Sequence, residues 1–128
     1  MSVHKYSRQR EAIKSFLAGR KDHPTADTIY TGLREEYPSL SLGTVYRNLA
    51  LLTDMGEIAR ISTGLGPERY DATVANHQHF ICTRCERVYD VETEGMDDLI
   101  HSAVKDCPGR IDSYTANFYG ICRDCLDS

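Results

Sequence analysis

The sequence lacks any run of 18 apolar residues, the length that a helix needs to cross a bilayer. Its amino-terminal residues are mostly polar and charged, in place of the apolar core of a secretion signal. Low-complexity segments are absent too, and 41% apolar with 27% charged residues is the composition of a soluble globular protein. We therefore expect a cytoplasmic protein that has no membrane partner.

The sequence also lacks the residue patterns of common enzymes. It has no glycine-rich phosphate loop, no Ser-His-Asp set and no acid–base pair of carboxylates, and Gly64-Leu65-Gly66 is explained as a turn. We therefore expect no enzyme and assign no catalytic residue. The reactive side chains that the sequence does offer are thiols and imidazoles.

Charge is divided unevenly along the chain. Residues 1–66 hold nine Lys or Arg against seven Asp or Glu, whereas residues 67–128 hold six against twelve. A basic first part and an acidic second part favour an anionic partner for the first and cations for the second. A solvated surface would explain the same pattern equally well.

Three helices are expected in the first part of the chain. Apolar residues at helical spacing predict helices over residues 7–18, 25–37 and 41–54. Gly19 ends the first helix and Pro38 the second. The second and third helices are joined by a short turn, which predicts a helix-turn-helix.

A hairpin follows the third helix. Strand-like runs over residues 57–62 and 68–73 flank a turn rich in glycine, and a hairpin in this place forms the wing of a winged helix. We therefore expect the protein to bind DNA. The candidate contacts are Thr44, Tyr46, Arg47 and Asn48 on the third helix, with Arg8, Arg10 and Lys14 in the basic amino-terminal part.

The second half predicts a small sheet with one helix. Strands are expected over residues 77–81, 87–91 and 110–121, and a helix over residues 96–105. So small a sheet is weakly stable alone, which favours pairing with a second copy. The fold class is therefore α+β, with a winged helix-turn-helix domain over residues 1–72 and a small α/β dimerisation and metal-binding domain over residues 73–128.

Four of the five cysteines form two Cys-x-x-Cys pairs, Cys82 with Cys85 and Cys122 with Cys125. Without a secretion signal, such pairs favour metal over disulfides. Two pairs together complete a closed tetrahedral site for structural Zn²⁺. A redox dithiol and an iron–sulfur cluster stay open as alternatives, and Cys107 is expected to have no part in the chemistry.

A second metal site is indicated by histidines and aspartates. His77 and His79 share one face of a strand, Asp71 ends the wing, Asp90 lies on the next strand, and His23 precedes a proline. Imidazole and carboxylate donors suit ferrous iron, manganese or zinc, and the absence of thiolate favours the first two. Such a site requires that three separate segments converge.

Four motifs together resemble the ferric uptake regulator family of bacterial repressors. They are His23-Pro24-Thr25-Ala26-Asp27, Gly43-Thr44-Val45-Tyr46-Arg47-Asn48-Leu49, His77-Gln78-His79-Phe80-Ile81-Cys82 and Tyr119-Gly120-Ile121-Cys122. Within that family the chain looks most like the peroxide-sensing branch. The resemblance implies a structural zinc held by the four cysteines and a regulatory Fe²⁺ or Mn²⁺ held between the domains by His23, Asp71, His77, His79 and Asp90.

The expectation that follows is a homodimeric repressor of a double-stranded DNA operator with an inverted repeat. The resemblance implies that it senses peroxide through iron-catalysed oxidation of a ligand histidine. An iron- or manganese-responsive uptake repressor of the same family is the nearest alternative. A thiol redox enzyme that uses the cysteine pairs is an alternative from another class.

Overall fold

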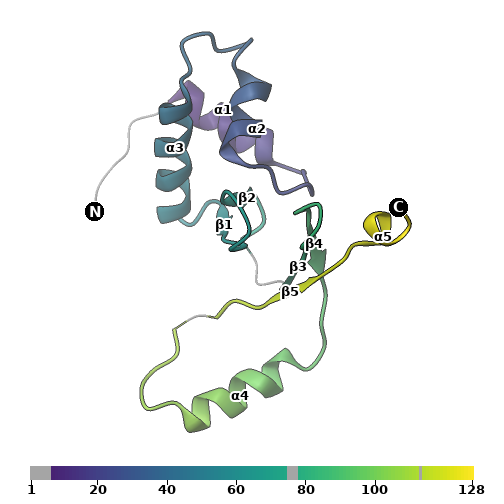
Figure 1. Ribbon diagram of the computed structural model, residues 1–128. Coiled ribbons are helices and arrows are strands. Elements are labelled where there is room, and N and C mark those ends of the chain that lie inside the picture. The colour runs from purple at the N-terminus through teal and green to yellow at the C-terminus, as the bar shows by residue number, and fades with distance from the viewer. Residues whose placement is uncertain (1–6, 75–77, 113) are drawn as a thin grey trace. The chain divides into compact units, whose positions relative to one another are not determined.

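The computed structural model describes residues 7–74, 78–112 and 114–128 of the chain. It divides into two compact units, Met1–Ala75 and Asn76–Ser128 (Figure 1). Each unit has its own helices and its own small sheet. Among the described residues, no helix combines the length and the apolar character that crossing a membrane requires.

Three helices begin the first unit: α1 (Arg8–Leu17), α2 (Ala26–Leu33) and α3 (Leu42–Asp54). Each starts at a hydroxyl side chain, Ser7, Thr25 or Ser41, whose oxygen accepts a hydrogen bond from the backbone N–H three residues later. Such a cap satisfies one of the N–H groups that the first helical turn leaves without a partner. The three predicted helices are thus confirmed.

The helices pack around one apolar core. Each helix contributes side chains that are fully buried, among them Ile13, Ile29 and Leu49. Residues at i, i+3 and i+4 along a helix share a face, so this core follows from the spacing of the apolar residues in the sequence.

The end of α2 differs from the prediction. The helix stops at Leu33 and not at Pro38, and a turn over residues 34–36 separates it from Tyr37. A proline disfavours helical backbone at the residue before it, so the helix cannot continue through Tyr37. The Tyr37 N–H donates to the Leu33 carbonyl at 3.0 Å, and the ring still packs against the core.

The predicted hairpin is confirmed and is shorter than expected. Strands β1 (Ala59–Ile61) and β2 (Arg69–Asp71) pair antiparallel, with Arg60 opposite Tyr70. Gly64 lies in the connection with a φ of 76°, a conformation that costs glycine little. Helix-turn-helix and hairpin together form a winged helix.

The second unit holds a three-stranded sheet. Its strands are β3 (Gln78–Cys82), β4 (Val88–Val91) and β5 (Asn117–Gly120), in the order β4-β3-β5. Strand β3 pairs antiparallel with β4 and parallel with β5. The third strand is much shorter than the predicted 110–121, because β3 offers it only the residues from His79 to Cys82 as partners.

Two helices complete this unit, α4 (Met96–Asp106) and α5 (Arg123–Leu126). Helix α4 buries none of its side chains within the described part of the chain, and Leu99 and Val104 are 61% and 54% exposed. The buried apolar residues of the unit come from the sheet and the cysteine turns, among them Ile81 and Val88. An apolar helix face therefore stays exposed in the single chain.

Helix α1 packs on α2 at a glycine, which gives a test of the first unit. A Cβ at Gly32 would lie 2.5 Å from Cε2 of Phe16, closer than van der Waals contact allows. We expect Gly32→Ala to lower the free energy of unfolding by about 1–3 kcal/mol through overpacking. Denaturant unfolding of the two proteins measures this difference.

The matched control is Gly43→Ala in α3. There the new Cβ would lie 3.3 Å from the flexible end of the Arg47 side chain, which can move away. Alanine is the better helix former by up to about 1 kcal/mol, so this variant should be as stable as the parent or more so. Equal effects of the two substitutions would contradict the packing described for Gly32.

Candidate metal sites and the exposed face of the third helix

Four cysteine sulfurs meet in the second unit. Cys82 ends β3, Cys85 follows in the turn, Cys122 precedes α5, and Cys125 lies within it. All four Sγ atoms lie within 4.8 Å of one another. Sγ of Cys82 lies 3.8 Å from that of Cys125, and Sγ of Cys85 lies 3.8 Å from that of Cys122.

These distances fit one tetrahedral ion. Four sulfurs at 2.3 Å from Zn²⁺ are separated by about 3.8 Å along each edge of the tetrahedron. A disulfide needs sulfurs about 2.05 Å apart, and the five cysteines of the described chain are all free thiols. An iron–sulfur cluster would spread its ligands over several irons, farther apart than this. The donor set and its spacing therefore fit a structural zinc.

Backbone N–H groups favour the thiolate form of two of these cysteines. The N–H groups of Cys85 and Cys122 each donate to Sγ of Cys82 at 3.4 Å, and that of Cys85 contributes most to lowering the pKa of the Cys82 thiol to about 5. The backbone N–H of Cys125 lowers the pKa of Cys122. Burial raises the pKa of Cys125 to about 12. The cluster therefore holds both negative charge and protons that a cation can displace.

Contacts between the two cysteine turns hold them together. The Gly120 carbonyl accepts hydrogen bonds from the N–H of Thr83 at 2.7 Å and from its hydroxyl at 3.2 Å. From the same turn, Arg84 Nη1 donates to the Cys125 carbonyl at 2.9 Å. The parallel pairing of β3 with β5 thus continues into the turns, which explains how pairs distant in sequence meet.

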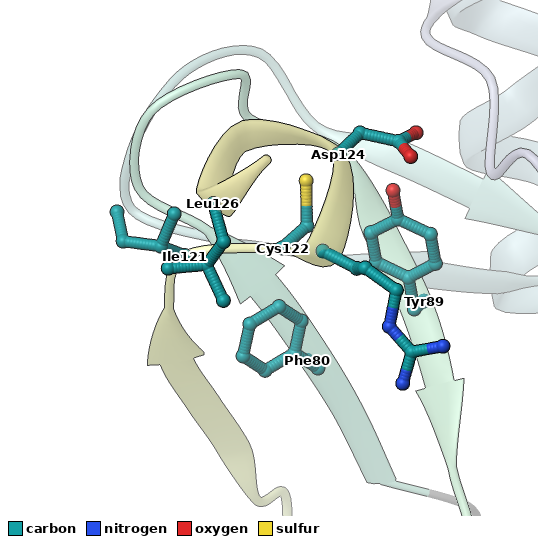
Figure 2. A pocket seen from close by; sticks show the side chains of 7 residues that line it. Phe80, Tyr89, Ile121, Cys122, Asp124 and Leu126 are labelled. Carbon is teal, nitrogen blue, oxygen red and sulfur yellow. The ribbon is translucent and has the colours of Figure 1, made fainter. Parts of the chain in front are cut away.

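A hollow of about 410 Å³ borders the cysteine cluster (Figure 2). The rings of Phe80 and Tyr89 lie 6.2 Å apart on one side of it, and the Tyr89 hydroxyl lowers the pKa of Cys122. Arg87 joins the two turns once more through a 2.9 Å contact with Asp124. The residues that line the hollow are Phe80, Tyr89, Ile121, Cys122, Arg123, Asp124 and Leu126.

A histidine and an aspartate are paired in the first unit. His23 is 1% exposed, and its Nε2 lies 3.4 Å from Oδ2 of Asp71 at the end of β2. The other Asp71 oxygen accepts a hydrogen bond from the Thr73 N–H at 2.9 Å. Both side chains are buried, which is unusual for such polar groups.

A second such pair lies in the other unit. His79 on β3 stands opposite Asp90 on β4, and Nε2 of the first lies 3.5 Å from Oδ1 of the second. His77, the remaining predicted ligand, lies outside the described residues. The structure thus brings His23 to Asp71 and His79 to Asp90, each pair within its own unit.

The separation within each pair suits metal ligands. A charge-assisted hydrogen bond between nitrogen and oxygen is about 2.7–2.9 Å long, which is shorter than the distance from Nε2 to the carboxylate oxygen in either pair. Donors at 2.1 Å from one ion lie about 3.0 Å apart in octahedral and about 3.4 Å apart in tetrahedral geometry, which the first pair matches and the second exceeds slightly. Nitrogen and oxygen donors without sulfur are those that ferrous iron and manganese accept.

The exposed face of α3 carries the predicted DNA contacts. Tyr46 is 45% exposed, and Arg47 is exposed with Nη2 donating to the Thr44 hydroxyl at 3.0 Å. The Asn48 amide donates to the Thr44 carbonyl at 3.1 Å, and the Thr44 hydroxyl lies 2.9 Å from that of Ser41. Ser41, Thr44, Arg47 and Asn48 are thus joined by hydrogen bonds that begin at the helix cap, and Tyr46 lies on the same helix.

Positive residues outside α3 have different environments. Arg8 is exposed and Arg10 is half-buried. Lys14 contacts Glu57 at 2.7 Å, and this hydrogen bond raises the pKa of the lysine. Its charge is therefore paired within the unit. Arg60, which is not among the residues predicted from the sequence, is also exposed, on β1 of the wing, and only its place in the hairpin signals it.

Fold and sites together define a class of protein: a winged helix joined to a second unit with a thiolate centre, and a pair of imidazole and carboxylate donors in each. The sequence model of the ferric uptake regulator family matches residues 2–119. The chain belongs to the ferric uptake regulator family.

Individual relatives agree with this membership. The peroxide-responsive repressor PerR of Staphylococcus saprophyticus is 34% identical over 119 residues, which are 93% of this chain and 80% of that protein. The Helicobacter pylori regulator Fur, described with three functional metal-binding sites, is 25% identical with a TM-score of 0.84, covering 97% of this chain and 83% of that one. The Campylobacter jejuni peroxide stress regulator is 28% identical with a TM-score of 0.77, covering 91% and 88%.

The cysteine cluster generates a prediction about stability. Cys122→Ser should unfold the second unit, because a structural zinc site contributes on the order of 10 kcal/mol to folding, comparable to the whole stability of a small domain. Zinc content and thermal unfolding followed by circular dichroism measure the loss.

Cys107→Ser is the control, because Cys107 lies at the end of α4, outside the cluster. It should keep both the zinc and the melting temperature of the parent. A Cys122→Ser protein with unchanged melting would rule out the closed four-cysteine site. Reactive free thiols in the parent protein, with no bound zinc, would instead favour a thiol redox enzyme.

Proposed function

We propose that this chain is a dimeric, metal-dependent transcriptional repressor that dissociates from its DNA operator when peroxide oxidises the protein. The relatives at 31–34% identity are peroxide-responsive repressors, which supports the peroxide signal. The observation that carries the proposal is the pair of His–Asp contacts, His23 with Asp71 and His79 with Asp90, in a chain whose thiolates are gathered elsewhere.

The two kinds of donor separate two roles for metal. The sulfurs of Cys82, Cys85, Cys122 and Cys125 would hold a structural Zn²⁺, which has no redox chemistry and keeps the second unit folded. The nitrogen and oxygen donors would hold Fe²⁺ or Mn²⁺ as the regulatory metal. The thiolates would thus select zinc, and the nitrogen and oxygen donors would select iron or manganese, so one chain can hold two different metals.

The regulatory metal would act by joining the two units. We propose that His23 and Asp71 from one unit and His77, His79 and Asp90 from the other bind the same ion. Ligands from both sides then favour one arrangement of the units, and binding shifts the population toward it. A dimer reads two half-sites only when its recognition helices have the right separation, so metal would control DNA affinity.

Peroxide sensing would follow from the same ligands. Ferrous iron held there would supply the chemistry that reduces peroxide, in which one oxygen atom would go to a neighbouring imidazole and the other would leave as water. His23 and His77 are the residues that the peroxide-sensing branch implies for this oxidation. An oxidised imidazole is a poorer ligand, so the two units are released from each other and the operator is freed.

A dimer is supported by apolar surface in the second unit. Leu99 and Val104 on α4 and Phe118 and Tyr119 on β5 are all exposed in the single chain. Burial of such side chains would contribute about 25 cal/mol for each Å² removed from water. Two-fold symmetry would pair the recognition helices with an inverted repeat in double-stranded DNA.

Arg47→Ala and Tyr46→Ala should weaken operator binding and leave zinc content and dimerisation unchanged. An exposed arginine can bind a guanine edge or a phosphate, and an exposed tyrosine can pack on a thymine methyl group. A side chain that reads a base contributes about 1–3 kcal/mol, measured as operator affinity by fluorescence anisotropy.

The charge-matched control is Lys14→Gln, which removes a positive charge already paired with Glu57. It should cost less operator affinity than Arg47→Ala. If both α3 variants bind the operator as the parent does, another element reads the DNA.

Peroxide should act only on the iron form. With Fe²⁺ loaded, a low dose should abolish operator binding and add one oxygen atom to His23 or His77, detected by mass spectrometry of peptides. With Mn²⁺ loaded, the same dose should leave binding and both histidines intact, because manganese does not readily drive this oxidation.

An iron- or manganese-responsive uptake repressor is the second candidate. The similarity to the Helicobacter pylori Fur structure, with a TM-score of 0.84, favours it. The two candidates differ in one outcome of the same experiment. An iron-loaded protein that stays bound to its operator and keeps its histidines unmodified after peroxide would favour the metal-responsive uptake repressor.

A further inference from the structure

The segment before α2 pairs with the wing. The Tyr70 N–H on β2 donates to the Pro24 carbonyl at 3.0 Å, and Thr25 forms an antiparallel bridge with Arg69. Strand β2 therefore has β1 on one side and residues 23–25 on the other. The backbone around His23 is held by the wing and not by the helices alone.

Arg69 makes a further contact to the same segment through its side chain. Its Nη1 donates to the carbonyl of His23 at 3.1 Å. His23 has a φ of 50°, in the left-handed region that residues with a Cβ adopt reluctantly. A conformation of this kind persists where surrounding contacts fix it, and the guanidinium supplies one such contact beside Pro24.

We infer that Arg69 is a positioning residue for the regulatory metal: by holding the His23 carbonyl, it aims the imidazole toward Asp71. This inference rests on the proposed function, since it takes His23 and Asp71 as metal ligands. Asp71 lies two residues after Arg69 on β2. One strand of the wing thus carries one ligand directly and fixes the backbone of the other.

Because Arg69 is positively charged, a positioning role and a purely electrostatic role predict opposite changes in metal affinity when it is replaced. A guanidinium near a divalent cation repels it, so electrostatics alone predicts tighter metal binding when this arginine is replaced by a neutral residue. Positioning predicts the opposite. Partners that orient metal ligands without touching the metal typically change metal affinity about 10- to 100-fold when they are mutated.

The experiment is a titration of the full, zinc-loaded chain with Mn²⁺ alone, in which the electron paramagnetic resonance signal of free Mn²⁺ gives the dissociation constant. Arg69→Gln should weaken Mn²⁺ binding by about 10- to 100-fold. Arg69→Lys keeps a donor and the charge but loses the fork of the guanidinium, and should weaken binding several-fold. Denaturant unfolding of each zinc-loaded protein, without Mn²⁺, shows which variants are folded.

Arg60→Gln is the matched control, because Arg60 is exposed on the other strand of the same hairpin, opposite Tyr70. It removes the same charge and should bind Mn²⁺ as the parent does. Operator binding by Arg69→Gln should recover at saturating Mn²⁺, which it would not do if Arg69 acted only by contacting DNA.

His23→Ala separates this inference from the proposed function. Loss of Mn²⁺ affinity in His23→Ala, with parental or tighter binding in Arg69→Gln, would overturn the role of Arg69 and leave the ligand set standing. Parental affinity in His23→Ala would overturn both. If Arg69→Gln is unfolded, Arg69→Lys decides: weaker binding supports the inference and parental binding overturns it.

Discussion

The parallel pairing of β3 with β5 is the constraint on which the second unit depends. The pairing ends with Cys82 opposite Gly120. Because the strands are parallel, both lead into their Cys-x-x-Cys turns at the same end of the sheet. The hydrogen bonds from Thr83 to Gly120 then fix the turns side by side. Four sulfurs placed in this way gather negative charge in a small volume, and a divalent cation at their centre would displace the remaining protons, balance that charge and complete the fold.

Strand β2 has the corresponding place in the first unit. It forms the wing with β1 and pairs with the segment before α2, so elements that are separate in sequence become one small sheet. Asp71 ends this strand, and His23 is held at its edge by Arg69. The imidazole and carboxylate pair is therefore built on backbone pairing. Sites on paired strands are held more rigidly than sites on free loops.

Much of this organisation could be predicted from the sequence, because it depends on local rules. The spacing of apolar residues marked the helices, and the spacing of Cys82, Cys85 and the second pair marked a zinc site. Contacts between distant segments could not be read in this way. The shortness of β5 depends on the length of β3, and the pairing of Lys14 with Glu57 depends on where α1 lies relative to the segment between α3 and β1.

Some assignments remain predictions. His77 lies outside the described residues, and the domain boundary between residues 72 and 73 rests on sequence. Periodicity also placed the end of α2 too late, because Tyr37 has the right spacing to join the helix but packs against the core from beyond the turn that follows the helix. The spacing of apolar residues predicts which side chains are buried more reliably than it predicts the secondary structure of their backbone.

The exposed face of α4 has a consequence for how much of the protein exists in a cell. No side chain of this helix is fully buried against the rest of the described chain, so the helix contributes most to folding when another surface covers it. If that surface belongs to a second copy, folding and association are one equilibrium, and the folded fraction rises with total concentration. Newly made chains at low abundance would be open to proteolysis until a partner is found, so the regulator's own level would set a threshold below which it does not accumulate.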